Sequence, residues 1–240
     1  MNLLLINGSP KGKNSNTYKL ATAFIEGLKR KDENAVIVEE LQTNTLEIKP
    51  CLGCFSCWRN PQGSCIIEDD MKEVIEKLLW ADITVWSFPL YYFNVPGKLK
   101  MLIDRQLPMV LPFMDTGKEN GGHPSRFDLS KKRHVIISTC GFYTAQGNYD
   151  SVIPMFSHLL GKDQFETIFC GQGELFRVPQ LADRTNEYLE YVKKAGEEFL
   201  EGKISEKTRK QLETLLFPRE IFESMADASW GVDKKDGEII

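Results

Sequence analysis

The sequence predicts a three-layer, doubly wound α/β sandwich built around a five-stranded parallel sheet. Two observations support this fold class. Short apolar runs alternate along the chain with segments of helical periodicity, and they follow one another in strand, helix, strand order. Strands separated by helices in this way form mostly parallel sheets that are covered on both faces. We expect residues 1–204 to form this domain and residues 205–240 to form a C-terminal helical extension.

The expected elements can be placed in order along the chain. The strands are at residues 3–6, 35–41, 82–88, 134–140 and 166–170. The first helix runs for about 17 residues from Asn16, with its apolar positions on one stripe. Asp70 and Glu73 match a capping box and open the next helix. Pro96 lies near the first turn of a third, and the last two span 151–160 and 181–200.

Two segments do not fit the repeat. Residues 106–132 are too long for a plain connection, and loops of this length in compact domains are usually lids, binding loops or interfaces. The tail from residue 205 is expected to form one or two helices, and its apolar residues need a cover from the domain or from a second subunit. We therefore expect a homodimer or a higher homo-oligomer.

Composition and charge exclude several classes of protein. Hydrophobic residues make up 42% and charged residues 27%, as in an ordinary soluble globular protein. The net charge of -4 gives no basic field for nucleic acid or anionic lipid, so neither is an expected partner. No apolar run approaches the roughly 20 residues of a membrane helix. "MNLLLING" has no basic region or cleavage site, which predicts a buried first strand and a cytoplasmic protein with reduced thiols.

The first strand ends in "NGSPKGKNSNT", residues 7–17, a loop rich in small and hydroxyl residues. It lacks both the Walker spacing and the dinucleotide fingerprint. Free amides and the helix dipole at the start of the following helix favour an anion. The loop therefore suits a single terminal phosphate, with donors and charge from Ser9, Lys11, Ser15, Asn16 and Thr17. The alternative is an ordinary polar turn with a helix cap.

Two further loops at the same sheet edge carry aromatic residues. The third strand runs into "SFPLYYFNVPGKLKMLIDR", and the fourth runs into "STCGFYTAQGNY". Tyr91, Tyr92 and Phe93 would serve as flat walls, with backbone amides between them for the polar edge of a ring. The alternative is that they pack against the neighbouring helix. One phosphate loop and two ring-binding loops at one edge indicate a site for flavin mononucleotide (FMN).

With these motifs in family order, residues 1–200 resemble the flavodoxin-like NAD(P)H-dependent FMN reductase superfamily. The resemblance implies that Ser9, Lys11, Asn16 and Thr17 hold the FMN phosphate. It also implies a ring site formed by Pro89, Leu90, Tyr91, Tyr92, Phe93, Asn94, Cys140, Gly141 and Phe142. Lys11 departs from the family, which commonly has arginine there, so charge is kept and bidentate phosphate contact is lost.

Four of the six cysteines lie in "CLGCFSCWRNPQGSC", at positions Cys51, Cys54, Cys57 and Cys65. Zinc sites usually pair two separated knuckles or include histidine, so this spacing disfavours zinc. Closely spaced cysteines are typical of iron–sulfur loops, and the motif resembles that of the iron–sulfur flavoproteins. One interpretation is therefore that the four thiols hold a 4Fe-4S cluster. A second is that the cysteines are small buried residues beside the flavin, as in cluster-free relatives. A third is that two of them form a redox-active dithiol.

The resemblance implies an oxidoreductase that passes electrons from NAD(P)H through bound FMN to a small-molecule acceptor such as a quinone. The flavin does the chemistry, so we assign no catalytic residue. One alternative is an iron–sulfur flavoprotein electron carrier with a cluster on the four cysteines. The other is a non-catalytic flavodoxin-like binding module that has lost the cofactor.

Overall fold

The computed structural model describes residues 1–240 except residues 31, 35, 118–120 and 232–240. Its sheet has five parallel strands in the order β2-β1-β3-β4-β5, which confirms the expected fold class. The strands are β1 (Asn2–Asn7), β2 (Ile37–Gln42), β3 (Ile83–Pro89), β4 (Arg133–Thr139) and β5 (Phe165–Cys170). Because the chain moves from β1 to one neighbour and then returns to the other, the strand order reverses at β1.

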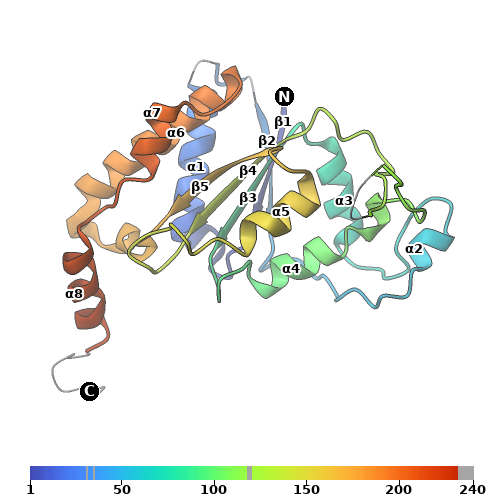
Figure 1. The fold of residues 1–240 in the computed structure, drawn as a ribbon, viewed down its shortest axis with the longest axis horizontal. Helices are drawn as coiled ribbons and strands as arrows, with labels where there is room; N and C mark the ends of the chain where they lie inside the picture. Colours follow the sequence, from blue (N-terminus) through green and yellow to red (C-terminus); the bar gives the residue numbers. More distant parts are fainter. Residues whose placement is uncertain (31, 35, 118–120, 232–240) are drawn as a thin grey trace.

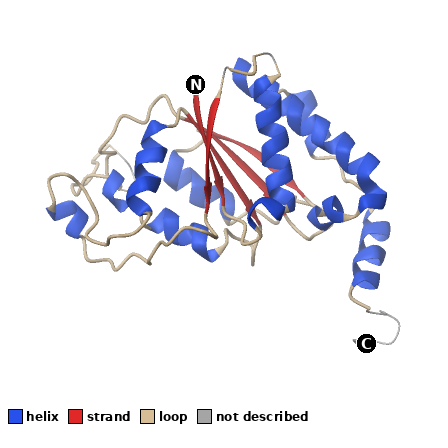
Figure 2. Ribbon diagram, turned by 180° about the vertical axis from the view of Figure 1, so that it is seen from behind, coloured by secondary structure: helices blue, strands red, loops and turns tan. Residues whose placement is uncertain are grey.

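Helices cover both faces of the sheet (Figures 1 and 2). One layer contains α1 (Asn16–Lys29) and α6 (Ala182–Glu201), and the other contains α3 (Met71–Trp80), α4 (Gly97–Asp104) and α5 (Val152–Leu160). Strand β1 serves both cores, since Leu3 and Leu5 join the α1 and α6 side while Leu4 and Ile6 join the other. Side chains alternate between the faces of a strand, so a wholly apolar strand is what a central position requires.

Two glycines let α1 and α6 cross with their backbones in contact. A Cβ atom added to Gly27 would lie 1.9 Å from the carbonyl oxygen of Lys193, and one added to Gly196 would lie 2.2 Å from that of Phe24. Real Cβ atoms essentially never come so close. The crossing therefore depends on the absence of a side chain at both positions.

The C-terminal extension forms α7 (Glu206–Leu212) and α8 (Arg219–Ser229), which confirms its expected helical character. Leu212, Leu216 and Phe222 are buried in the core that α1 and α6 share. In Figure 1, α8 projects below the sheet, beyond the edge where the strands end. No helix in the described part of the chain is both long and apolar enough to cross a membrane.

The described parts of the segment from residue 106 to 132, residues 106–117 and 121–132, form an irregular loop. A short 3-10 turn (Leu107–Met109) is followed by an antiparallel bridge between Val110 and Ser125. Within this loop Met109 is buried in the core, whereas Phe113 and Met114 are 58% and 60% exposed.

One local expectation was wrong. Asp70 precedes α3 without capping it through its side chain, because its Oδ2 accepts from the amide of Glu47 instead, at 2.7 Å. The aspartate before it, Asp69, accepts from the Met71 amide at 3.1 Å. A four-residue helix, α2 (Ser56–Arg59), lies inside the cysteine segment, for which we made no prediction of a helix or a strand. It is too short to produce a periodic pattern.

Candidate functional site

The candidate site lies at the carboxyl edge of the sheet, the lower edge in Figure 1. Ligands in open parallel sheets bind outside this edge, next to the strand where the order reverses. Here that strand is β1, and its neighbours are β2 and β3. The loops that follow β1, β3 and β4 therefore meet at one place, as the sequence predicts.

The loop after β1 is held by its own polar groups. Asn7 is fully buried, and its Oδ1 accepts from the Ser9 amide at 3.1 Å. The Ser9 hydroxyl in turn accepts from the amide of Lys11 at 3.2 Å. Gly12 adopts a positive φ of 54°, and a short 3-10 turn (Gly12–Asn14) leads into α1. Ser15 caps α1, since its hydroxyl accepts from the Tyr18 amide at 3.1 Å.

A network of side chains fixes this loop to β2. The Asn7 amide group donates to Gln42 at 2.8 Å, and Gln42 donates to Glu40 at 3.2 Å. Glu40 also pairs with Lys13 at 2.9 Å and accepts from the Tyr18 hydroxyl at 2.9 Å. Lys13 is thereby directed toward β2. Lys11 is also exposed, and it forms no ion pair with any residue that the structure describes.

The residues predicted to bind the phosphate differ in the burial and the hydrogen-bond partners of their side chains. Ser9 and Ser15 are buried, at 1% and 4% exposure. The Thr17 hydroxyl lies 2.6 Å from that of Thr139 and is fully buried, so it faces β4 rather than the loop. The first turn of a helix nevertheless leaves amides without intrahelical acceptors, and Asn16 and Thr17 supply two of them.

Asn16 joins the loop to the far side of the site. Its Nδ2 donates to the carbonyl oxygen of Gly173 at 2.7 Å. Its Oδ1 is buried and has no hydrogen-bond partner among the described residues. A buried acceptor without a donor costs free energy, so this atom fits a ligand that brings a hydroxyl group.

The loop after β3 contains a tight turn made by aromatic residues. Tyr91 and Asn94 exchange backbone hydrogen bonds at 2.9 and 3.0 Å. The two residues between them, Tyr92 and Phe93, adopt positive φ angles of 47° and 63°. Large side chains rarely adopt this backbone region, and such outliers gather at functional sites. Pro89 ends β3, and the Leu90 amide donates to the Thr139 carbonyl at 2.9 Å.

The aromatic side chains of this turn are open to solvent. Tyr91, Tyr92 and Phe93 are 45%, 99% and 49% exposed, so none of them is buried against a helix. Phe93 stacks on Phe142, from the loop after β4, with ring centroids 5.4 Å apart and planes 14° from parallel. Phe142 is itself 43% exposed. The two loops thus meet through a stacked pair of partly exposed rings.

Cys140 and Gly141 lie directly before Phe142. Cys140 is buried, and burial raises the pKa of its thiol. A Cβ atom on Gly141 would lie 2.7 Å from a carboxylate oxygen of Glu174. Cys140 and the buried Cys170 belong to the two hydrophobic cores, one on each face of the sheet. All three ring-flanking residues predicted after β4 are therefore at the site, although only Gly141 and Phe142 are exposed.

The turn after β5 contributes a residue that we did not predict, Gln172. It is fully buried and has a positive φ of 58°. Its amide donates to the Phe142 carbonyl at 2.7 Å, and the next amide, of Gly173, donates to the Cys140 carbonyl at 2.8 Å. The signal was available in "GQGELF", because this stretch follows a strand of the same parallel sheet.

The cysteine segment is fastened by a buried ion pair. Arg105 and Asp69 are 1% and 2% exposed in their side chains and form two hydrogen bonds, at 2.7 and 3.0 Å. Arg105 also donates to the Lys49 carbonyl at 2.7 Å and contacts the Cys65 sulfur at 3.5 Å. Burial opposes the charge on Asp69, but hydrogen bonds from Arg105 and two amides lower its pKa overall. The pair holds both ends of the segment together.

The four candidate ligand thiols are free and lie in one neighbourhood. Burial raises the pKa of the Cys57 thiol, and the three other thiols of the loop raise it further. Cys51 and Cys54 are exposed, and hydrogen bonds from Ser56 lower the pKa of Cys54. No group of three or more metal-ligating side chains within the described ranges is placed to hold a metal ion. In this geometry the cysteines do not fit a cluster.

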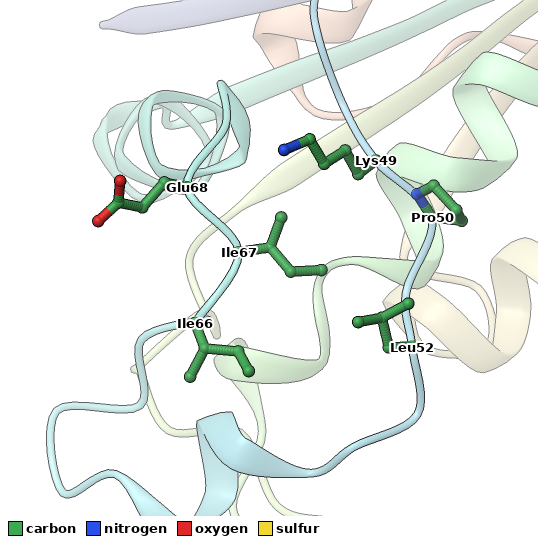
Figure 3. A pocket seen from close by; sticks show the side chains of 6 residues that line it. All are labelled: Lys49, Pro50, Leu52, Ile66, Ile67 and Glu68. Atoms are coloured by element: carbon green, nitrogen blue, oxygen red, sulfur yellow. The ribbon is translucent and has the colours of Figure 1, made fainter.

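Two hollows are lined by residues other than those predicted to bind FMN. One, of about 670 Å³, opens between the two ends of the cysteine segment. Figure 3 shows Leu52 and Ile67 extending into it from facing chain segments, while Glu68 points away. The other, of about 380 Å³, lies between β5, the loop at 143–150 and residues 209–216 of the extension. Neither is lined by the predicted FMN residues.

Comparisons with known proteins agree with this arrangement. The family model described as the flavodoxin-like fold matches residues 1–192. An iron-sulfur flavoprotein of Methanocaldococcus jannaschii is 32% identical over 126 residues, which is 50% of this chain and 60% of that protein. An FMN-dependent NADH:quinone oxidoreductase of Mesorhizobium japonicum is 28% identical over 67% of this chain and 78% of its own length. This chain thus spans less than two thirds of the iron-sulfur flavoprotein.

A solved structure supports the fold. The FMN-dependent NADH-azoreductase from Bacillus anthracis, in complex with FMN, aligns with a TM-score of 0.58 at 20% identity. The alignment covers 82% of this chain and 98% of that one. At 20% sequence identity, this similarity shows a shared fold. The family match, the strand order and the three converging loops agree: the chain belongs to the family of proteins with the flavodoxin-like fold, which confirms the resemblance expected from its motifs.

Proposed function

We propose that this protein is an FMN-dependent NAD(P)H oxidoreductase that passes electrons to a small-molecule acceptor such as a quinone. One observation carries the proposal. The polar loop at the start of α1 and the stacked pair of Phe93 and Phe142 all follow strands β1, β3 and β4 at the carboxyl edge of the sheet, where ligands of such sheets bind. The names of the quinone oxidoreductase relative and of the azoreductase structure support the same reaction class.

The residues present fit FMN. The amides of Asn16 and Thr17 and the charge of Lys11 suit its phosphate, and the unpaired Oδ1 of Asn16 suits a hydroxyl of its ribityl chain. Phe93 and Phe142 offer an exposed apolar surface to its ring. When bound, FMN supplies the hydride and electron chemistry between a reduced nicotinamide and a second substrate. The chain's own residues bind and orient it, and none is needed as a general acid or base.

A paired ligand comparison tests the phosphate assignment. The purified protein is titrated with FMN and with riboflavin, which lacks the phosphate. We expect Lys11→Met to weaken FMN binding by about tenfold and to leave riboflavin binding unchanged, since a charged contact contributes roughly 1–2 kcal/mol. Lys13→Met is the matched control, because Lys13 is engaged by Glu40. A wild-type protein that binds neither flavin would refute the proposal and favour a non-catalytic binding module.

NADH and NADPH oxidation by the FMN-loaded protein tests the reaction. We expect oxidation of at least one nicotinamide to require added FMN and to accelerate with a soluble quinone. A loaded protein that oxidises neither nicotinamide would contradict the enzymatic part of the proposal.

An iron–sulfur flavoprotein electron carrier is the second candidate. It is favoured by the name of the Methanocaldococcus jannaschii relative and by the close spacing of Cys51, Cys54, Cys57 and Cys65 in the sequence. Among the described residues, however, the four thiols are not placed to hold a metal ion. Visible spectra and iron and sulfide analysis of protein purified without oxygen distinguish the candidates. Stoichiometric iron and sulfide would support the carrier, and two flavin bands without iron would support the first candidate.

A further inference from the structure

The C-terminal extension is joined to the ring side of the candidate flavin site by one buried side chain. The Oε1 atom of Gln172 accepts from the Phe217 amide at 2.9 Å, and its Nε2 donates to the Phe217 carbonyl at 2.8 Å. The same Nε2 donates to the Tyr143 carbonyl at 3.1 Å. Gln172 thus fastens the linker between α7 and α8 to the residue directly after Phe142.

The backbone around Gln172 also contacts the loops of the candidate flavin site. Its amide donates to the Phe142 carbonyl, and a Cβ atom on the preceding Gly171 would lie 2.9 Å from the backbone of Thr144. The following carbonyl, of Gly173, accepts from Asn16. The turn at 171–173 therefore contacts both the phosphate loop and the aromatic loop, so a shift in it moves both.

Elsewhere the extension and the loop after β4 are separated. The hollow of about 380 Å³ lies between residues 143–150 and residues 209–216, with Gln172 in its lining. Arg219 adds a contact across this region, because its guanidinium lies 4.5 Å from the Tyr143 ring centroid. Gln172 and Arg219 therefore both contact Tyr143. The extension also lies beyond residues 1–192, the part of the chain that the family model matches.

We propose that Gln172 is a positioning residue through which the C-terminal extension holds the loop at 141–147 in its FMN-binding conformation. This inference rests on the proposed function. A fully buried side chain that satisfies three backbone groups of two segments leaves them without partners when it is removed. Loss of the link frees the Phe142 loop to sample other conformations, and FMN binding then has to select the competent one.

A substitution with a matched control tests the proposal. Gln172→Met keeps the length of the side chain and removes its three hydrogen bonds. We expect it to weaken FMN binding by about tenfold, within the range of measured couplings. Arg184→Met is the control, since Arg184 fastens the same extension to α6 through the Leu215 and Leu216 carbonyls, at 2.9 and 3.1 Å, without contacting the loop. It should lower the melting temperature and leave the FMN dissociation constant unchanged.

A measurement on the wild-type protein keeps the proposal testable if Gln172→Met does not fold. Coupling is reciprocal, so FMN binding should slow hydrogen exchange in peptides covering residues 215–218. Peptides from α3, on the opposite face of the sheet, should show no change. Unchanged exchange at 215–218 on FMN binding, or a Gln172→Met variant with the wild-type dissociation constant, overturns the positioning role. A wild-type protein that does not bind FMN refutes the proposed function instead.

Discussion

The rings of Phe93 and Phe142 stack with centroids 5.4 Å apart, although they belong to loops that follow different strands. Each ring is close to half exposed, so the contact adds little to the core. We expect Phe142→Ala to weaken FMN binding about three- to tenfold, as the loss of one aromatic contact predicts. The melting temperature should change little. Fluorescence titration with FMN measures the effect, and unchanged affinity would show that this surface does not hold the ring.

The fully buried hydroxyl pair of Thr17 and Thr139 gives a stability prediction. Thr17→Val leaves the Thr139 hydroxyl buried without its 2.6 Å partner, which costs about 1–3 kcal/mol. The double variant Thr17→Val/Thr139→Val should lose less than the sum of the single variants, because neither hydroxyl is then left unpaired. Urea unfolding of the four proteins measures the coupling. Strict additivity would mean that the two hydroxyls do not interact.

The buried pair of Arg105 and Asp69 predicts a large loss when one partner is removed. Arg105→Met leaves a buried carboxylate without its cation, and we expect a loss of roughly 3–5 kcal/mol in unfolding free energy. Lys100→Met is the control on the same helix, because the pair with Asp104 is exposed and contributes about 0.5 kcal/mol or less. Similar losses for the two variants would contradict the role given to burial.

His134 predicts a dependence of stability on pH. Burial, and to a smaller extent the charge of Lys132, lowers its pKa to about 4 from the ordinary histidine value of 6.5. The unfolded chain therefore binds more protons than the folded protein between these values, and stability falls as the pH drops from 6.5 towards 4. Between pH 7 and pH 5 this group should cost about 2 kcal/mol. His134→Gln should remove that part of the slope in urea unfolding, and an unchanged slope would refute the assignment.

The sheet and its helices were predictable because their signals are local. An apolar run such as Leu3–Ile6 and the stripe on the following helix need no partner to be recognised. The convergence of the three loops was also predictable, since parallel strands all end at one edge.

Contacts between distant segments were not predictable from periodicity. Nothing in the sequence pairs Phe93 with Phe142, or Gln172 with Phe217, because each contact depends on loop conformations that the fold sets. The cap expected at Asp70 failed for a related reason: a distant amide, that of Glu47, competes for the same carboxylate. The sequence shows how the four cysteines are spaced, but spacing alone does not determine the orientation of their thiol groups.

The crossing of α1 over α6 has a consequence for how this chain can change. The atoms that would collide with a methyl group at Gly196 belong to the main chain of α1, and those facing Gly27 belong to the main chain of α6. Trimming a neighbouring side chain therefore cannot rescue a larger residue at either place. Any suppressor of Gly196→Ala has to move a whole helix, so we expect revertants to restore glycine rather than to arise at a second site.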